Sequence, residues 1–449
     1  MSGLSDYQRV VAYYGDDFTG STDVMEALTV NGLPAVLFFE PPSDDRLARF
    51  PACRAVGVAG TSRSRSPEWM KQHLRPVFER LKELGTPLVH YKICSTFDSS
   101  PEVGNIGCAI EIGREVFGSR YVPLVVGAPV LGRYTVFGNH FAAGGGEVYR
   151  LDRHPTMSRH PVTPMDEADL RTQLKRQAGL SAGLIDILAL RGEPEQPDRR
   201  FDEVVSAGPD VVLFDVLDDA SLVPIGRLLW ERRAASGPFV AGSSGLEYAV
   251  AAYWRSVGEL PAAANRFDAG PVDRLIVVSG SCAPVTAQQI RTSFANGFDG
   301  LRLDVRPLAR GDAAAIEEAV EAGLQPLGRG RSVVLYTALG PDDPALVEPG
   351  LRTPEFNAAL GRSLGAILLR LIERSGVRRV AVCGGDTSGH AGNVLGVYAL
   401  TMAAPMAPGS PLCRAHSDNP QLDRLEVVFK GGQNGNEQLF SQVREGRAR

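Results

Sequence analysis

The sequence has no apolar run that approaches the ~18 residues of a membrane-spanning helix. Its N-terminus also lacks a basic region followed by an apolar stretch and a cleavage site, so we expect a cytoplasmic protein with no membrane partner. The basic residues are scattered and the formal net charge is -5, which argues against a nucleic-acid-binding surface. No CxxC pair occurs, so neither disulfides nor structural zinc are indicated for the six cysteines, Cys53, Cys94, Cys108, Cys282, Cys383 and Cys413.

Several nucleotide-binding and catalytic signatures are missing as well. There is no Gly-Lys dipeptide, which excludes a GxxxxGK[ST] loop, and there is no GxGxxG for a dinucleotide site. The seven histidines form no HExxH motif. In the order Asp-Asp-Phe-Thr, Phe18 stands where haloacid-dehalogenase phosphatases carry their second acid. These absences disfavour a nicotinamide-dependent dehydrogenase and an aspartyl-phosphate mechanism.

The sequence does contain short apolar segments that alternate with helix-period segments, which predicts an α/β fold. A chain of 449 residues is too long for one ordinary core. The stretch 258–273 is rich in Pro, Ala and Gly without periodicity, and it predicts a linker. We therefore predict an N-terminal domain at 1–257 and a C-terminal domain at 274–449, each with a largely parallel sheet flanked by helices, and an active site in the cleft between them.

The loop "GDDFTGS" follows the first predicted strand, where ligands of parallel sheets bind. A single acid would suffice to cap the helix that follows. Two adjacent acids, Asp16 and Asp17, raise the local negative potential and tend to raise one pKa, which suits a base, a metal ligand or an acceptor for sugar hydroxyls. We therefore predict a functional role for this pair and leave open which of the two is the base.

Two further loops of the first half carry polar side chains. In "TSRSRSPEW" Arg63 is predicted to bind an acid and Arg65 to be a solvated surface charge, because a guanidinium pairs bidentately with carboxylate or phosphate. The loop "YKICSTFDSSPEVGN" has more donors and acceptors than helix capping requires, which favours a polyhydroxylated ligand bound by Ser95, Thr96 and Asp98.

Three glycine-rich turns follow predicted strands of the second half, in "VVSGSCAP", "VCGGDTSGHAG" and "FKGGQNGN". Such turns direct backbone N–H groups toward phosphate at a helix N-terminus. Any one of them could be an ordinary strand-to-helix turn, but three in one domain favour a nucleotide-phosphate site. The residues that we predict to contact the nucleotide are Ser279, Ser281, Gly384, Gly385, Asp386, Thr387, Gly432 and Gly435.

Taken together, these stretches resemble the four-carbon acid sugar kinase family across essentially the whole chain. "DDFTGSTD", "SRSRSPE", "CSTFDSSPEVGNIG" and "HPVTPM" resemble its N-terminal motifs, and "SGSC", "GGDTSG" and "KGGQNG" resemble its nucleotide loops. "KGGQNGN" departs from the more usual Lys-Ser-Gly-Asn-Phe-Gly, and "GDDFTG" departs from Ala-Asp-Asp-Phe-Thr-Gly. These departures leave the identity of the sugar acid open.

The resemblance implies an ATP- and Mg²⁺-dependent kinase that phosphorylates the terminal hydroxyl of 3-oxo-tetronate, threonate or erythronate. It implies Asp16 and Asp17 as catalytic residues, Arg63 as the group that holds the substrate carboxylate, and sugar contacts from Asp17, Ser95, Thr96, Phe97 and Asp98. It implies no metal ligands that we can name. The alternatives are a kinase of a longer acid sugar and a non-catalytic sensor of a sugar acid and a nucleotide, and base rates favour a homodimer.

Overall fold

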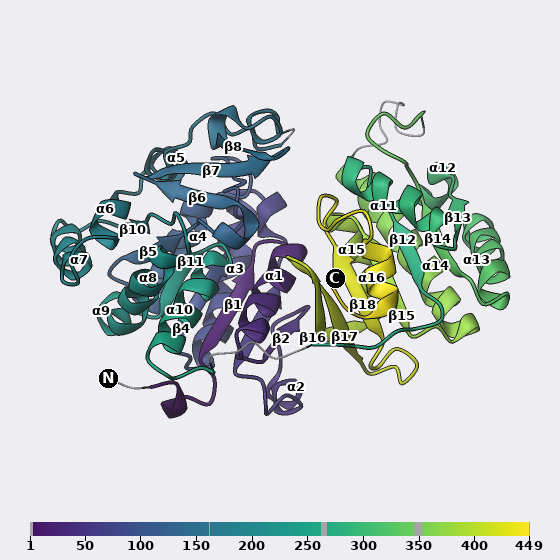
Figure 1. The fold of residues 1–449 in the computed structure, drawn as a ribbon, viewed down its shortest axis with the longest axis horizontal. Coiled ribbons are helices and arrows are strands. Elements are labelled where there is room, and N and C mark those ends of the chain that lie inside the picture. The colour runs from purple at the N-terminus through teal and green to yellow at the C-terminus, as the bar shows by residue number, and fades with distance from the viewer. Residues whose placement is uncertain (1–2, 161, 262–266, 345–352, 449) are drawn as a thin grey trace. The chain divides into compact units, whose positions relative to one another are not determined.

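The computed structural model describes residues 3–160, 162–261, 267–344 and 353–448 (Figure 1). Contacts divide the chain into two compact units, which comprise residues 1–35 with 40–265, and residues 36–39 with 266–449. Each unit has an α/β architecture with a mostly parallel sheet, which confirms the predicted fold class. Strand β2 (Ala35–Phe38) lies largely in the second unit, so the prediction that residues 1–257 all belong to the first domain is wrong at this strand.

The sheet of the first unit consists of seven parallel strands. Almost all of their residues are buried, as expected for Val- and Leu-rich strands that are covered by helices on both faces. β1 lies between β3 and β4, so the loops that follow these three strands emerge next to one another. The strand order is β3 (Ala55–Ala59), β1 (Val11–Gly15), β4 (Leu88–Lys92), β11 (Phe239–Gly242), β5 (Val122–Val125), β10 (Val211–Phe214) and β9 (Ala182–Ile185).

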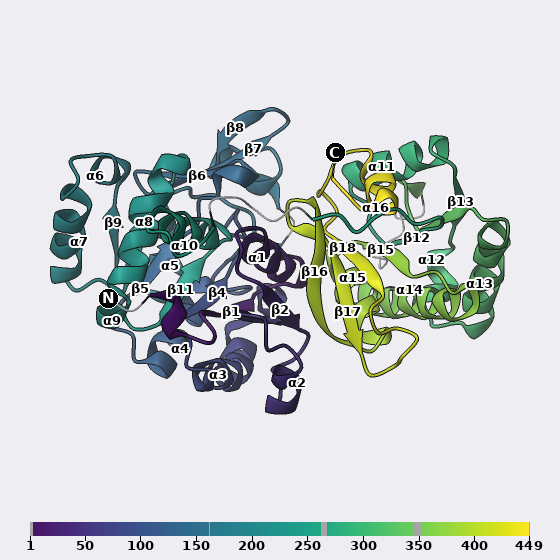
Figure 2. The same cartoon turned by 60° about the horizontal axis from the view of Figure 1, so that its bottom comes forward.

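Helices of the first unit cover both faces of this sheet (Figure 2). α3 (Pro67–Glu83) and α4 (Ile106–Phe117) pack against each other and supply Met70, Phe78 and Ile110 to the main core. α4 begins at Ile106, because the Asn105 side chain caps it by accepting from the backbone N–H of Cys108 at 2.7 Å. The other helices are α1 (Phe18–Val30), α2 (Asp44–Ala48), α5 (Leu170–Ala178), α6 (Ile187–Leu190), α7 (Gln196–Ser206), α8 (Asp219–Glu231), α9 (Arg233–Ser236) and α10 (Gly245–Ser256).

A small antiparallel sheet in the first unit was not predicted from the sequence. It consists of β6 (Arg133–Val136), β7 (Asn139–Gly144) and β8 (Glu147–Arg150), and Figures 1 and 2 both show these strands together. The buried side chain of His140 joins this sheet to the loop after β4, because its Nε2 lies 2.7 Å from the carbonyl oxygen of Ser95. The sheet therefore supports one of the polar loops singled out above.

The second unit has five parallel strands followed by three antiparallel ones, and the strand from the first half of the chain is one of the latter. The long β16–β17 hairpin was not predicted from the sequence. The order is β13 (Phe298–Arg302), β14 (Ser332–Tyr336), β12 (Ile276–Ser279), β15 (Arg379–Cys383), β18 (Glu426–Lys430), β17 (Ser410–Ser417), β16 (Val397–Ala407) and β2.

The helices of the second unit connect these strands, and among them α14 packs closely against both α13 and α15. No helix of the described residues is both long enough and apolar enough to span a membrane. The helices are α11 (Pro284–Ala295), α12 (Val305–Ala309), α13 (Ala313–Gly328), α14 (Pro354–Ser375), α15 (Gly385–Val394) and α16 (Leu439–Glu445).

Candidate functional sites of the two units

The first candidate site is formed where β1, β3 and β4 end. Asp16 follows β1, and its backbone N–H donates to the carbonyl of Lys92 at 2.9 Å while its carbonyl accepts from the backbone N–H of Arg63 at 3.0 Å. The guanidinium of Arg63 donates two hydrogen bonds to the Asp16 carboxylate, from Nη2 at 2.6 Å and from Nε at 3.1 Å. The Asp16 side chain is only 2% exposed, so it acts here as an internal partner of Arg63.

The neighbouring carboxylate of Asp17 is more accessible, with 24% of its side chain exposed. It caps α1, because Oδ1 accepts from the backbone N–H of Gly20 and Oδ2 accepts from the Thr19 hydroxyl, both at 2.8 Å. It also lies 2.8 Å from Arg63 Nη2. The capping interpretation is therefore correct for one of the two acids, and Arg63 ties both acids together.

The environment of the two carboxylates moves their pKa values in opposite directions. Burial raises the pKa of Asp16, and Arg63 only partly offsets this. Burial also raises the pKa of Asp17, but Arg63, Lys92 and the hydrogen bonds from Thr19 and Gly20 outweigh it, so the pKa of Asp17 is lowered. Burial lowers the pKa of Arg63, but the two carboxylates outweigh it and hold that pKa well above its usual value. The expected separation of the two acids is thus present.

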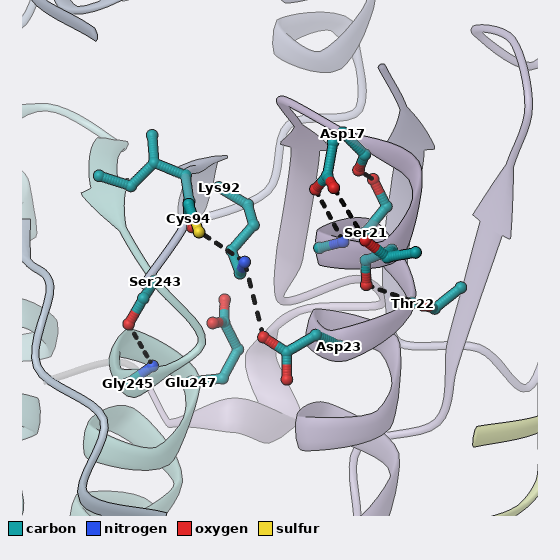
Figure 3. A network of polar contacts seen from close by, with 12 residues as sticks. Asp17, Ser21, Thr22, Asp23, Lys92, Cys94, Ser243, Gly245 and Glu247 are labelled. Carbon is teal, nitrogen blue, oxygen red and sulfur yellow. Dashed lines mark hydrogen bonds and ion pairs between the residues drawn. The ribbon is translucent and has the colours of Figure 1, made fainter. Parts of the chain in front are cut away.

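Lys92, which we did not include among the predicted site residues, ends β4 beside this cluster. Figure 3 shows its side chain and that of Asp23 from α1 pointing toward one another, and Nζ lies 3.5 Å from Asp23 Oδ2. Nζ also donates to the carbonyl of Ile93 at 2.9 Å. A Cβ at Gly20 would lie 2.4 Å from Asp17 Oδ1 and 3.0 Å from Lys92 Nζ, so only glycine fits between these charged groups.

The residues of the loop after β4 that we predict to bind the sugar differ in their burial and polar contacts. The Thr96 hydroxyl donates to Asp98 Oδ1 at 2.7 Å and lies 3.0 Å from Cys94 Sγ, so these side chains form one polar group. The Phe97 side chain is fully buried in the core of the first unit, so the predicted contact of Phe97 with the sugar, which stays a prediction, would have to come from its backbone. Its left-handed backbone, with φ at 57°, turns the loop.

The second candidate site is formed by the loops after β12, β15 and β18. The backbone N–H of Gly280 donates to the carbonyl of Cys383 at 3.0 Å, and the N–H of Gly384 donates to the carbonyl of Lys430 at 2.9 Å, so the three loops are joined in sequence. A Cβ at Gly280 would lie 2.4 Å from the Thr387 hydroxyl oxygen. Thr387 therefore lies against Gly280, the residue after Ser279, and Gly385 is exposed at the start of α15.

The remaining predicted residues of this site lie in different environments. Gly432 lies against the loop after β12, since a Cβ there would meet Ser281 Oγ at 3.0 Å. Gly435, with φ at 82°, faces Leu439 and Gln289 instead, so glycine is required there by conformation and packing. The side chain of Asp386 lies outside the described part of the structure.

Lys430, also absent from the predicted site residues, is fully buried beneath these glycines. Its Nζ donates to the Thr286 hydroxyl at 2.8 Å, and Thr286 in turn donates to the carbonyl of Gly432 at 2.8 Å. Burial lowers the pKa of Lys430. Its Lys-Gly-Gly sequence at a strand end was the signal that could have identified it.

Each of the two units matches a known family of protein domains. The family described as "Sugar-binding N-terminal domain" matches residues 11–250, and the family described as "Nucleotide-binding C-terminal domain" matches residues 276–440. The chain is 50% identical to a 3-oxo-isoapionate kinase of Paraburkholderia graminis over 98% of its own length and 94% of the relative. It is 29% identical to a 3-oxo-tetronate kinase of Cupriavidus necator, with 98% of each chain covered.

A solved structure from Salmonella typhimurium LT2, described as a putative tRNA synthase, has the same fold. It aligns with a TM-score of 0.79 at 25% identity, and the alignment covers 96% of this chain and 98% of that one. The similarity therefore extends over both units.

Proposed function

This chain belongs to the four-carbon acid sugar kinase family, and on that premise we propose that it transfers the γ-phosphoryl group of ATP to a hydroxyl of a 3-oxo sugar acid. The observation that carries the proposal is the cluster of Asp16, Asp17 and Arg63 at the carboxyl end of β1, within the unit whose relatives are described as sugar-binding. Phosphoryl transfer depends mainly on positioning and on electrostatic stabilisation, with a carboxylate near the attacking hydroxyl.

We assign the proton-accepting role to Asp17. It is the more exposed of the two acids, and its lowered pKa keeps it ionised at neutral pH. Asp16 is buried and occupied by Arg63, so it orients the loop and the guanidinium instead. Ser95, Thr96 and Asp98 supply further contacts to the sugar. The predicted binding of the substrate carboxylate by Arg63 stays a prediction, and Nη1 is the group of Arg63 without a partner among the described residues.

On the nucleotide side, we propose that the turns at Ser279–Ser281, Gly384–Thr387 and Gly432 bind the ATP phosphates through backbone N–H groups. α15 begins at Gly385 with no side-chain cap, so its first N–H groups remain directed outward for an anion. The second unit's relatives are described as nucleotide-binding, which supports this assignment.

We further propose Mg²⁺ as the ATP-bound cofactor. No cluster of three or more His, Cys, Asp or Glu that could hold a metal occurs in the described part of the chain. This fits Mg²⁺, which protein sites commonly hold through one or two carboxylates together with substrate phosphates. When bound, the ion neutralises charge on the β- and γ-phosphates. A cytoplasmic location, a homodimer and a reaction site between the two units stay predictions.

The identity of the acid is tested by coupled ADP release from the purified protein with Mg-ATP. The panel contains 3-oxo-isoapionate, the 3-oxo-tetronates, and D- and L-threonate and erythronate. Because the 3-oxo-isoapionate kinase is the more similar relative, we expect the highest kcat/KM with 3-oxo-isoapionate. Turnover of none of these acids by a protein that still binds ATP would contradict the proposal and favour a sensor of a sugar acid and a nucleotide.

A further inference from the structure

Arg133 lies at the first position of β6, in the small antiparallel sheet that packs on the loop after β4. Its Nη1 donates to three backbone carbonyls, those of Leu131 at 2.9 Å, Gly132 at 3.2 Å and Ala143 at 3.3 Å. These bonds fix the plane of the guanidinium. Its orientation is therefore set by the chain itself before any ligand arrives.

The other edge of this guanidinium has no protein partner. Nε is buried without a hydrogen bond, and Nη2 has no hydrogen bond among the described residues. No carboxylate of the described residues lies within ion-pair distance of Arg133, and burial lowers its pKa. Unlike Nε, Nη2 is not fully buried, so Nη2 is the unpartnered donor of this edge that a ligand can reach.

Arg133 and Arg63 both lie close enough to the Cys94 side chain for it to affect the pKa of each guanidinium. Asp98, in the loop that follows, also acts on Arg133, although it forms no ion pair with it. The two arginines differ in whether a neighbouring carboxylate neutralises their positive charge. Arg63 is neutralised by Asp16 and Asp17, whereas Arg133 retains a positive charge that no neighbouring acid pairs with.

We propose that Arg133 is a specificity-determining residue that binds the carboxylate of the sugar acid through Nη2. A hydrogen bond from a guanidinium to a carboxylate is charge-assisted and therefore stronger than one between neutral groups. The proposal rests on the proposed function and deepens it, since it names the residue by which the site distinguishes an acid from a neutral polyol. Arg63 then remains paired with Asp16 and Asp17, and the proposal replaces the predicted binding of the substrate carboxylate by Arg63.

The test is a calorimetric measurement of the dissociation constant of the acid without ATP, so that it does not depend on turnover. Arg133→Met removes the charge, and Arg133→Lys keeps the charge but loses the guanidinium that the Nη1 hydrogen bonds hold in place. Arg153→Met is the matched control, because Arg153 follows the same small sheet and its side chain is 75% exposed. The probes are 3-oxo-isoapionate and D-erythronate, with erythritol as the neutral analogue of the latter.

We expect Arg133→Met to weaken binding of the acids by roughly 10- to 100-fold, as for loss of charge-assisted hydrogen bonds, while erythritol binding changes less than about twofold. Arg133→Lys should fall between wild type and Arg133→Met, and Arg153→Met should match wild type. If Arg133→Met fails to fold, the Arg133→Lys measurement alone decides.

Equal weakening of acid and polyol would overturn the inference, because it would indicate a packing role for the three carbonyl contacts. Unchanged acid affinity in an enzyme that turns over the acid would also overturn it and leave the proposed function intact. Conversely, loss of acid affinity in Arg133→Met without any turnover by wild type would contradict the proposed function alone.

Discussion

The loops at the strand ends of the two units use different chemistry. In the first unit the site is made of charged side chains, and Arg63 Nη2 lies 2.6 Å from the Asp16 carboxylate and 2.8 Å from the Asp17 carboxylate. In the second unit the corresponding positions are mostly glycines and hydroxyls, and the one nearby charged side chain that we describe, Lys430, is buried beneath the backbone. Side-chain charges suit recognition of hydroxyls and acids, whereas exposed backbone N–H groups suit phosphate.

The largest effect should come from the accessible acid of the first unit. Asp17→Asn should lower kcat by about 10²–10⁴-fold, because asparagine still caps α1 but cannot accept the proton. Steady-state kinetics with Mg-ATP measure this. Asp169→Asn is the matched control, since Asp169 also caps a helix and also pairs with an arginine, Arg171. Losses below roughly tenfold in both Asp16→Asn and Asp17→Asn would remove the base from this loop.

The next effect concerns His140, which joins the small antiparallel sheet to the loop after β4. Burial lowers the pKa of His140 to about 4, so His140 is neutral in the folded protein. The unfolded chain takes up its proton near pH 6.5, and the stability that this histidine contributes is therefore present above pH 6.5 and lost as the pH falls toward 4. The loss should amount to about 3 kcal/mol, and urea unfolding across this range should show a shallower pH dependence in His140→Gln. If the free energy of unfolding had the same pH dependence in His140→Gln and in the wild-type protein, His140 would not be the source of the effect.

A smaller effect is expected when a side chain is added to one of the glycine-rich turns of the second unit. Gly280→Ala should raise the KM for ATP by about tenfold, because the new Cβ would meet the Thr387 hydroxyl at 2.4 Å and displace the loop. The KM for the acid should stay within about twofold of wild type. Gly389→Ala in α15 is the control, since nothing lies within 4 Å of a Cβ there. Equal increases in both KM values would show that the two sites are not chemically separate.

The smallest effect should come from Arg65, which contrasts with Arg63 two residues away. Arg65 is exposed and lies over the Trp69 ring with its Cζ 5.2 Å from the centroid. Arg65→Ala should therefore leave kcat and KM unchanged and cost at most about 1 kcal/mol in thermal unfolding. A change in the KM for the acid would place Arg65 in the site and contradict the prediction that it is a solvated charge.

The sequence was sufficient to predict the parallel sheets and the strand-end loops, because buried parallel strands leave continuous apolar runs and their carboxyl ends converge. It was not sufficient for β2, whose apolar residues fit either unit equally well until its partner β16 is known. It also did not separate Asp16 from Asp17, because the difference arises from Arg63, which is far away in the sequence. The burial of Phe97 depends on a left-handed backbone that its neighbours do not indicate.

Hydrogen exchange of backbone amides with each ligand added separately tests the division of chemistry between the two units most directly. ATP should slow exchange in the loops at 279–283, 384–388 and 430–435 and leave the loop at 16–20 unchanged, whereas the acid should protect 16–20 and 94–98. Protection of the loop at 16–20 by ATP alone, or no protection of the glycine loops, would contradict the account.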